Sequence, residues 1–211
     1  GRAVGRVAAI VNERYNHHRR ESEAEAPTKG FFGFFDSIDS PDVTRGLLES
    51  AAHWLREHGA AEMIGPASPS QNYEYGILIE GHDRPHRYLL AYQPRYYQRL
   101  LESAGLEKAK DMMSVSLDIE DPVAWAAAKR WIDRLDAAHQ SKERPITVRS
   151  IYLRRLDDEV ATAARLFNEV LSRHWGHVPL SSGEMADLAQ GLRHVIVPDL
   201  LLFAETQGEP V

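Results

Sequence analysis

The residues best suited to a chemical role lie in Gly30–Gly59, where a phenylalanine-rich stretch leads through a short turn into an amphipathic helix. The turn reads Asp39-Ser40-Pro41-Asp42, and in it Ser40 suits an N-cap and Pro41 suits the first helical position. Backbone N–H groups at such a helix start can bind an anion, commonly a phosphate. Arg45, in the first turn, is the nearby side chain suited to a phosphate. The sequence therefore predicts either an anion site at this turn or a strand–turn–helix unit with a purely structural role.

Cysteine is absent from the chain, which excludes disulfides, thiolate catalysis and cysteine-ligated zinc. One histidine pair, His82 and His86 with Asp83 beside it, has a spacing that would bring two metal ligands to one face of a helix. The glycine and proline residues around this pair oppose a helix. We therefore expect no metal site and no metal cofactor.

The segment from Asn12 to Lys29 is polar and charged and is predicted to be a mobile loop. It contains a local basic cluster made of Arg14, Tyr15, His17, His18, Arg19 and Arg20. A solvated loop is the simpler interpretation of this cluster. A loop that faces a phosphate or a substrate is the alternative.

The composition is ordinary for a soluble globular protein, with 211 residues, of which 43% are hydrophobic and 27% are charged. No apolar run approaches the roughly 18 residues of a membrane helix, and no secretory signal opens the chain. We expect a cytoplasmic location and no membrane partner, and the net charge of −6 disfavours nucleic acid as a partner. The abrupt ends, at Gly1-Arg2 and at Pro210-Val211, lead us to expect a piece of a longer protein.

The first part of the chain alternates between strand and helix patterns. The run Val7–Val11 is almost continuously apolar, which predicts a central strand covered on both faces. The predicted strands are Arg2–Asn12, Phe31–Ile38, Ala60–Ile64 and Lys110–Ile119, and the predicted helices are Val43–Glu57, Pro94–Gly105 and Pro122–Gln140.

The last part of the chain follows a polar linker, Ser141–Arg144, which is the expected domain boundary. Ser181 or Ser182 is the expected cap of the last helix, with Glu184 near its start. The predicted strands are Ile146–Arg155 and Leu200–Glu205, and the predicted helices are Asp157–His174 and Gly183–Val195. This order of elements predicts an α/β or α+β layer protein with a mixed sheet.

Four stretches of the chain resemble a known family: GRVAAIVN, GFFGFFDSID, GPASPSQNYEYG and YQPRYYQRLLESAGL. With the order of elements, they resemble the GNAT acyltransferase superfamily, and in particular bacterial proteins with two tandem GNAT modules. The resemblance covers nearly the whole chain. It implies an α/β (α+β) fold with a GNAT-like, mixed and mostly antiparallel central sheet flanked by helices.

The resemblance implies that the chain does not begin and end at the boundaries of a GNAT module. Residues 1–120 resemble a module without its N-terminal elements, residues 121–145 a helix and linker, and residues 146–211 the N-terminal strand–helix–helix–strand set of a second or permuted module. The terminal strands, in Gly1–Asn12 and Leu200–Glu205, are therefore expected to pair, either within one chain or between the two chains of a homodimer. Each would otherwise be an exposed apolar edge.

The function that the resemblance implies is acyl-CoA-dependent N-acyl transfer, from acetyl-CoA or another acyl-CoA to an amine or another small-molecule substrate. In that mechanism a carboxylate or an ordered water takes a proton from the amine, and a splayed strand offers a backbone N–H to the carbonyl oxygen. The implied catalytic residues are Glu74 or Glu80 as the base and Tyr97 or Tyr92 as the acid. The implied cofactor contacts are Phe35, Asp36, Ser37, Ile38, Val43, Thr44 and Arg45.

Two departures from the family pattern keep alternatives open. The turn lacks the glycines of the family's pyrophosphate loop, and the carboxylates of Asp39 and Asp42 would repel a phosphate. The family's general-acid tyrosine is replaced by Leu101, and Tyr97, one turn earlier, either reaches the site or packs in the core, which is the favoured interpretation. The alternatives are a non-catalytic GNAT-like module with a degenerate CoA loop, which binds a ligand or partner, and an aminoacyl-transferring enzyme that uses a charged tRNA.

Overall fold

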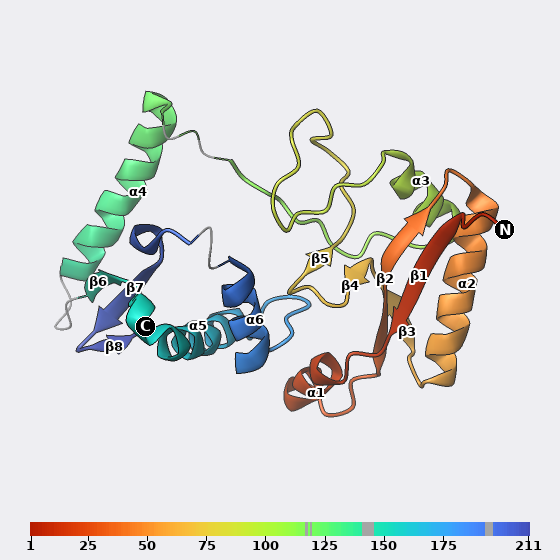
Figure 1. Ribbon diagram of the computed structural model, residues 1–211, viewed down its shortest axis with the longest axis horizontal. Helices are drawn as coiled ribbons and strands as arrows, with labels where there is room; N and C mark the ends of the chain where they lie inside the picture. Colours follow the sequence, from red (N-terminus) through yellow and green to blue (C-terminus); the bar gives the residue numbers. More distant parts are fainter. Residues whose placement is uncertain (117, 119, 141–145, 193–195) are drawn as a thin grey trace. The chain divides into compact units, whose positions relative to one another are not determined.

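The computed structural model describes residues 1–116, 118, 120–140, 146–192 and 196–211 (Figure 1). The chain divides into two units, each with its own sheet. The first unit consists of Gly1–Lys110 and Leu171–Pro179, and the second consists of Asp111–Val170 and Leu180–Val211. Among the described residues, no helix is both long enough and apolar enough to cross a membrane.

The main sheet of the first unit has the order β1-β2-β3, from β1 (Gly5–Ile10), β2 (Lys29–Ser37) and β3 (Glu62–Ile64). β1 is antiparallel to β2, whereas β3 is parallel to β2. The prediction that the first strand is central is wrong, because β1 lies at the edge of this sheet. A short apolar run indicates that a strand is covered, but it does not indicate how many strands flank it.

Helix α2 (Pro41–Glu57) connects the two parallel strands and lies along the sheet, as Figure 1 shows. Its start was predicted correctly, since the Ser40 side chain accepts a hydrogen bond from the Val43 N–H at 3.5 Å. Gly59 after its end has φ +78°, the left-handed conformation that favours glycine. The buried face of α2 packs on β2 and on α3 (Tyr96–Ser103), in a core of Phe32, Phe35, Leu48, Ala51, Tyr97 and Leu101.

The prediction of a mobile loop after β1 is wrong, because residues Glu13–Ser22 form helix α1. Asn12 caps this helix by accepting a hydrogen bond from the Tyr15 N–H at 2.9 Å. The buried Asn16 side chain donates to the Lys29 carbonyl at 2.9 Å and accepts from the Lys29 N–H at 2.8 Å. The buried side of α1 is narrow and partly polar, so the sequence carries little of the periodicity that identifies a helix.

The rest of the first unit contains little regular structure before α3. Strands β4 (Ala67–Ser68) and β5 (Glu74–Tyr75) form a two-stranded antiparallel ribbon. Helix α3 was predicted correctly, with Gly105 at φ +90° just beyond its end.

The predicted strand Lys110–Ile119 is wrong over residues 110–116 and 118, which form no strand, while Leu117 and Ile119 lie outside the described residues. The side chains of Met112, Met113 and Val115 are exposed. Alternation along this segment therefore reflects no buried sheet face.

The second unit contains α4 (Pro122–Gln140), α5 (Leu156–Leu171), α6 (Ser182–Leu192) and the short 3₁₀ turns η1 (Leu153–Arg155) and η2 (Pro198–Leu200). Its antiparallel sheet has the order β6-β7-β8, from β6 (Ile146–Ser150), β7 (Leu202–Thr206) and β8 (Glu209–Pro210). The predicted linker Ser141–Arg144 and the last residues of the predicted helix Gly183–Val195 lie outside the described residues.

Two expectations for the second unit have different outcomes. Ser181 caps α6 as predicted: its hydroxyl accepts from the Glu184 N–H at 3.2 Å, and the Glu184 carboxylate accepts from the Ser181 N–H at 2.9 Å. Strand β7 pairs with β6 and with β8. Because β8 pairs with β7 only at Glu205 and Thr206, the expected pairing of this strand with the N-terminal strand, within one chain or between two, stays a prediction.

The predicted fold class is confirmed. The described residues form six α-helices together with one mixed sheet and two antiparallel sheets, which is a mixed α/β architecture.

Candidate functional site

The predicted cofactor contacts lie at the end of β2 and the start of α2. β2 and β3 are paired only from Lys29↔Glu62 to Phe31↔Ile64, and beyond this point β2 continues to Ser37 paired with β1. Ligands of α/β units commonly bind at the carboxyl ends of parallel strands. The structure therefore brings residues 35–38 and 43–45 to one end of this strand–helix–strand unit.

A bulge precedes this end of β2. The register passes from Arg6↔Asp36 to Ala8↔Gly33, so that Phe34 and Phe35 lie opposite a single residue of β1. Phe34 has φ +48°, and its N–H donates to the Ser68 hydroxyl at 2.8 Å. The bulge turns the Phe34 side chain outward while Phe35 is buried.

Ser37 is the hydrogen-bonding centre of the site. Its N–H donates to the Tyr97 hydroxyl at 3.2 Å, and its carbonyl accepts from the Tyr96 hydroxyl at 3.0 Å. Its own hydroxyl accepts from Thr44 at 3.1 Å and donates to the Ile38 carbonyl at 2.9 Å. Strand β2, helix α2 and helix α3 are thus tied together through one buried serine.

Tyr97 packs in the core, as the favoured interpretation predicted, and its hydroxyl bonds to Ser37 and Asp36 at the end of β2. The hydroxyl donates to Asp36 Oδ1 at 3.4 Å, while Asp36 Oδ2 accepts from Arg6 Nε at 2.6 Å. Burial raises the pKa of Tyr97, and the nearby Asp36 charge raises this pKa further, although the Ser37 N–H opposes the shift. The phenol therefore holds its proton at neutral pH.

Two backbone N–H groups in the first turn of α2 are bonded to its cap residue, Ser40. The Val43 N–H donates to the Ser40 hydroxyl, and the Thr44 N–H donates to the Ser40 carbonyl at 3.1 Å. Arg45 pairs with Asp42 at 3.4 Å on the exposed surface. A phosphate bound here would compete with Asp42 for this guanidinium.

Each of the three aspartates around the turn has an arginine partner. These exposed pairs are Arg6–Asp36, Arg45–Asp42 and Arg99–Asp39. Exposed ion pairs of this kind contribute about 0–1 kcal/mol each. The arginines can therefore exchange a carboxylate for a phosphate at small cost.

Two of the remaining predicted catalytic residues, Glu74 and Tyr92, are hydrogen-bonded to residues of the segment that precedes α3. Glu74 accepts from Gln93 Nε2 at 3.0 Å, and Gln93 Oε1 accepts from the Leu78 N–H at 3.2 Å. Tyr92 donates to the His82 carbonyl at 2.9 Å, and Glu80 is exposed. Within the described ranges, no hydrogen bond or ion pair joins Glu74, Glu80 or Tyr92 to Tyr97.

The histidine pair adopts no metal-binding arrangement. His86 Nε2 lies 2.7 Å from the Leu90 carbonyl and therefore donates to it. In the part of the chain that the structure describes, no three His, Cys, Asp or Glu side chains are grouped so that they could hold a metal ion.

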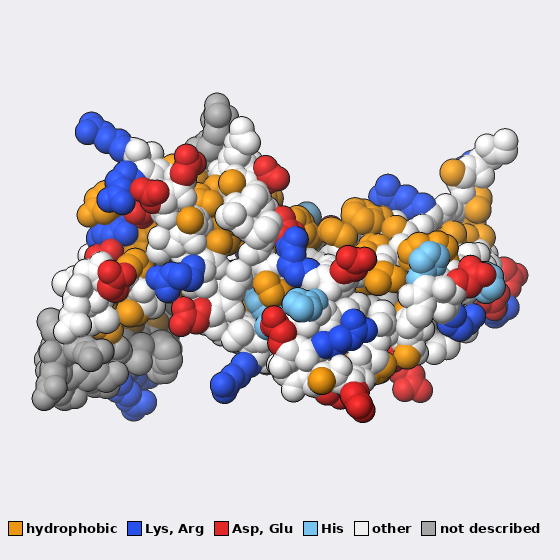
Figure 2. Space-filling model, turned by 90° about the horizontal axis from the view of Figure 1, so that it is seen from below, with side chains coloured by type: hydrophobic (Ala, Val, Ile, Leu, Met, Phe, Trp, Pro, Cys, Tyr) orange, Lys and Arg blue, Asp and Glu red, His pale blue; other side chains and the backbone are white. Residues whose placement is uncertain are grey.

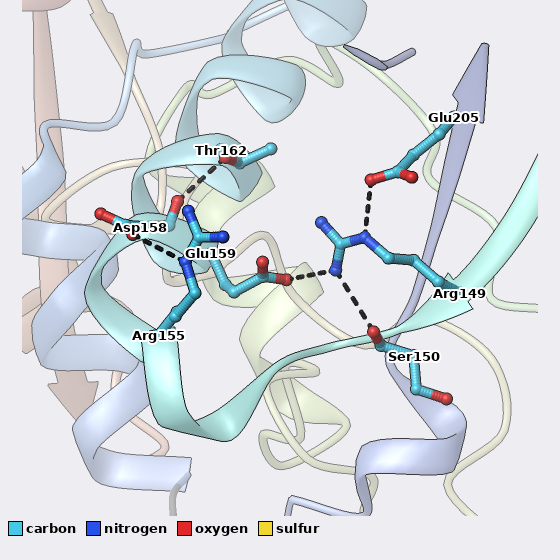
Figure 3. Close-up of polar contacts among 7 residues, drawn as sticks. All are labelled: Arg149, Ser150, Arg155, Asp158, Glu159, Thr162 and Glu205. Carbon is cyan, nitrogen blue, oxygen red and sulfur yellow. Dashed lines mark hydrogen bonds and ion pairs between the residues drawn. The ribbon is translucent and has the colours of Figure 1, made fainter. Parts of the chain in front are cut away.

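A charged cluster in the second unit was missed by sequence reasoning (Figure 3). Arg149 donates from Nε to Glu205 at 2.6 Å and from an Nη to Glu159 at 2.7 Å. The rings of Tyr152 and Phe203 lie 4.4 and 5.0 Å from its guanidinium carbon. The two glutamates raise the pKa of Arg149. No local pattern signals this cluster, because its members come from β6, α5 and β7.

Positive and negative side chains are mixed on the surface. Figure 2 shows basic and acidic side chains interspersed over one face, with no broad area of a single sign among the residues drawn in colour. The arginine–aspartate pairs around the α2 turn follow the same pattern.

No protein-family model and no solved structure matches the chain. The chain is homologous to Protein YghO of Escherichia coli K12, with 29% identity over 210 residues, which cover 100% of this chain and 50% of that protein. It is also homologous to the bacterial ceramide synthase of Caulobacter vibrioides, with 30% identity over 209 residues, which cover 99% of this chain and 51% of that protein. The chain thus spans about half the length of the curated relatives it matches.

Proposed function

We propose that this chain is part of an acyl-CoA-dependent N-acyltransferase that acylates an amine. The observation that carries the proposal is the 30% identity, over 99% of the chain, to a protein named as a ceramide synthase. A ceramide is the amide of a fatty acid and a long-chain amino alcohol, so its synthesis can proceed by transfer of an acyl group to an amine. The proposed acceptor is therefore an amine, and the proposed cosubstrate is acetyl-CoA or a longer acyl-CoA.

In the proposed reaction, the amine nitrogen attacks the thioester carbon, the C–N bond forms and the C–S bond breaks. Glu74 or Glu80 takes the proton of the amine, directly or through a water molecule. Tyr97, or Tyr92 as the second candidate, gives a proton to the departing thiolate. Burial raises the pKa of Tyr97, so the phenol is protonated before the reaction begins, but the same shift makes it a weaker acid.

The proposed cofactor site is the end of β2 with the first turn of α2. Backbone groups of Phe35–Ile38 would contact the acyl-pantetheine part, and the turn through Val43, Thr44 and Arg45 would contact the pyrophosphate. Support comes from the parallel β2–α2–β3 unit and from the exchangeable pairing of Arg45 with Asp42.

A second candidate is a non-catalytic module that binds a ligand or a partner. It is favoured by one observation: the first N–H groups of α2 already bond to Ser40, beside the carboxylates of Asp39 and Asp42. In that case the turn would bind acyl-CoA weakly, and no amide would be formed.

The test is an assay of the longer parent protein and of this chain with a long-chain acyl-CoA and a long-chain amino alcohol. We expect free CoA thiol and amide to appear in a one-to-one ratio, followed by a thiol reagent and by mass spectrometry. Thiol release without amide would mean hydrolysis and would overturn the acceptor assignment. Folded parent protein that forms neither product would favour the binding module.

A further inference from the structure

One exposed segment of the first unit is unusually apolar for a surface turn. We call residues Arg84–Tyr92 the apolar turn. The exposed fractions of four of its residues are 70% for Tyr88, 48% for Leu89, 40% for Leu90 and 43% for Tyr92. Large apolar residues on protein surfaces usually occur singly. A run of them along one turn therefore calls for a partner that covers it.

The apolar turn is held in a defined conformation. The Leu90 N–H donates to the Arg87 carbonyl at 3.1 Å, and His86 Nε2 donates to the Leu90 carbonyl at 2.7 Å. Tyr92 closes the base of the turn through its bond to the His82 carbonyl and through its ring, which lies 5.5 Å from the His86 ring. The exposed side chains are thus presented by a closed loop.

Leu89 has φ +60° at the corner of this turn. That conformation belongs to glycine and asparagine in most turns and is strained for leucine. With 48% of its surface exposed, Leu89 gains little from packing within the unit. The strain therefore favours a role for this side chain outside the folded chain.

The charge of the apolar turn contrasts with that of the whole protein. The loop that Tyr92 closes on His82 contains two exposed arginines, Arg84 and Arg87, and one exposed carboxylate, Asp83, so it is net positive, whereas the full chain has a net charge of −6. Exposed tyrosine and leucine flanked by arginine are typical of segments that enter the headgroup region of a bilayer. Arginines at such a surface are attracted by the phosphates of anionic lipids.

We propose that the apolar turn docks on the surface of an anionic lipid bilayer. Tyr88, Leu89 and Leu90 enter the headgroup region, and Arg84 and Arg87 contact lipid phosphates. This differs from the expectation of no membrane partner, which considered only spanning helices. The inference goes beyond the proposed acyl transfer and does not depend on it.

The test is flotation of the full chain, without substrates, with vesicles of phosphatidylcholine alone or mixed with phosphatidylglycerol. We expect binding to the anionic vesicles, weakened about fivefold by each of Arg84→Gln and Arg87→Gln. Leu89→Gly removes the side chain and relieves the strained φ, so the fold is kept while binding falls at least tenfold. Met113→Gly, at a 91% exposed apolar residue outside the turn, is the control and should leave binding unchanged.

The outcomes separate this proposal from the others. Wild-type chain that stays unbound, or Leu89→Gly that binds as tightly as wild type, would overturn the lipid assignment. A wild-type dimer in sedimentation that Leu89→Gly abolishes, without vesicle binding, would assign the turn to a second copy of the chain instead. Because no substrate is present, none of these results bears on the proposed acyl transfer.

Discussion

Ser37 and Tyr97 show how a few polar atoms organise the end of the main sheet. The Ser37 N–H has the Tyr97 hydroxyl as its acceptor, although the two residues are 60 positions apart in the chain. The same hydroxyl reaches Asp36, whose carboxylate holds Arg6. The conformation of the proposed cofactor site therefore depends on the hydroxyl of one core residue.

Tyr97→Phe tests this dependence. The substitution keeps the packing of the ring but leaves the buried Ser37 N–H without its acceptor, which costs about 1–3 kcal/mol. We expect a loss of that size in the free energy of unfolding, measured by urea denaturation. Tyr96→Phe removes the bond to the neighbouring Ser37 carbonyl in a partly buried position and should cost less. If Tyr97→Phe and Tyr96→Phe both left the free energy of unfolding unchanged, the hydrogen bonds of Ser37 would not stabilise the fold.

Arg45→Ala tests the proposed phosphate contact. A charge-assisted hydrogen bond contributes about 1.5–3 kcal/mol, so the affinity for acyl-CoA should fall at least tenfold in calorimetric titration. Arg56→Ala, at the opposite end of α2, is the matched control and should leave the affinity unchanged. An unchanged affinity in Arg45→Ala would remove this turn from the cofactor site.

At the scale of elements, the close approach of β4 to β2 shapes the site. A Cβ atom at Gly33 would collide with the backbone carbonyl of Ala67, and the neighbouring Ser68 hydroxyl accepts the Phe34 N–H. This contact joins backbone to backbone, so no side-chain rotation can relieve a collision. The bulge of β2 is therefore fixed from outside by the ribbon that follows β3.

Gly33→Ala should be destabilising for this reason. Overpacking of a buried contact costs about 1–3 kcal/mol or more, and a lower thermal unfolding midpoint should report it. Gly46→Ala is the matched control, because a Cβ at this exposed position of α2 meets no atom within 4 Å. That change should stabilise the helix by up to about 1 kcal/mol. A Gly33→Ala variant as stable as wild type would show that β4 moves freely against β2.

On the scale of the whole molecule, the chain returns to its first unit late in the sequence. Leu171–Pro179 belongs to the first unit, where Val178 is buried against Tyr15, Phe31 and Ala67. The Val178 carbonyl accepts from Asn72 at 2.8 Å. A segment from late in the sequence therefore packs in the first unit, which the order of elements along the chain does not predict.

His177 makes the stability of this segment depend on pH. Burial lowers the pKa of His177, and the positive charges of His18 and His174 lower it further; the His18 ring lies 5.4 Å away, beside Glu21. As the pH falls below 6.5, the ordinary pKa of histidine, the unfolded chain therefore binds a proton before the folded chain does. Stability falls with pH in that window.

His177→Gln should flatten this decrease. The thermal midpoint of the variant should change less between pH 7 and pH 5 than that of the wild type. His53→Gln, on the exposed side of α2, should keep the wild-type slope. Identical slopes for His177→Gln and wild type would assign the pH dependence to other groups.

The sequence by itself determined the elements whose signals are local. The Ser40 cap and Gly59 bound α2, Gly105 ends α3, and Ser181 with Glu184 starts α6, all through interactions between residues a few positions apart. Such interactions have the same meaning in any fold. The mixed α/β class follows from the same local patterns.

Tertiary structure alone decided the features that join distant residues. Helix α1 depends on the bonds of Asn16 to Lys29, Tyr97 acquires its partners from β2, and Arg149 finds its glutamates on α5 and β7. In each case a polar group is buried or partly buried only because a remote segment supplies its hydrogen-bond partner. Burial without such a partner would be unfavourable, and the partner cannot be identified before the chain has folded.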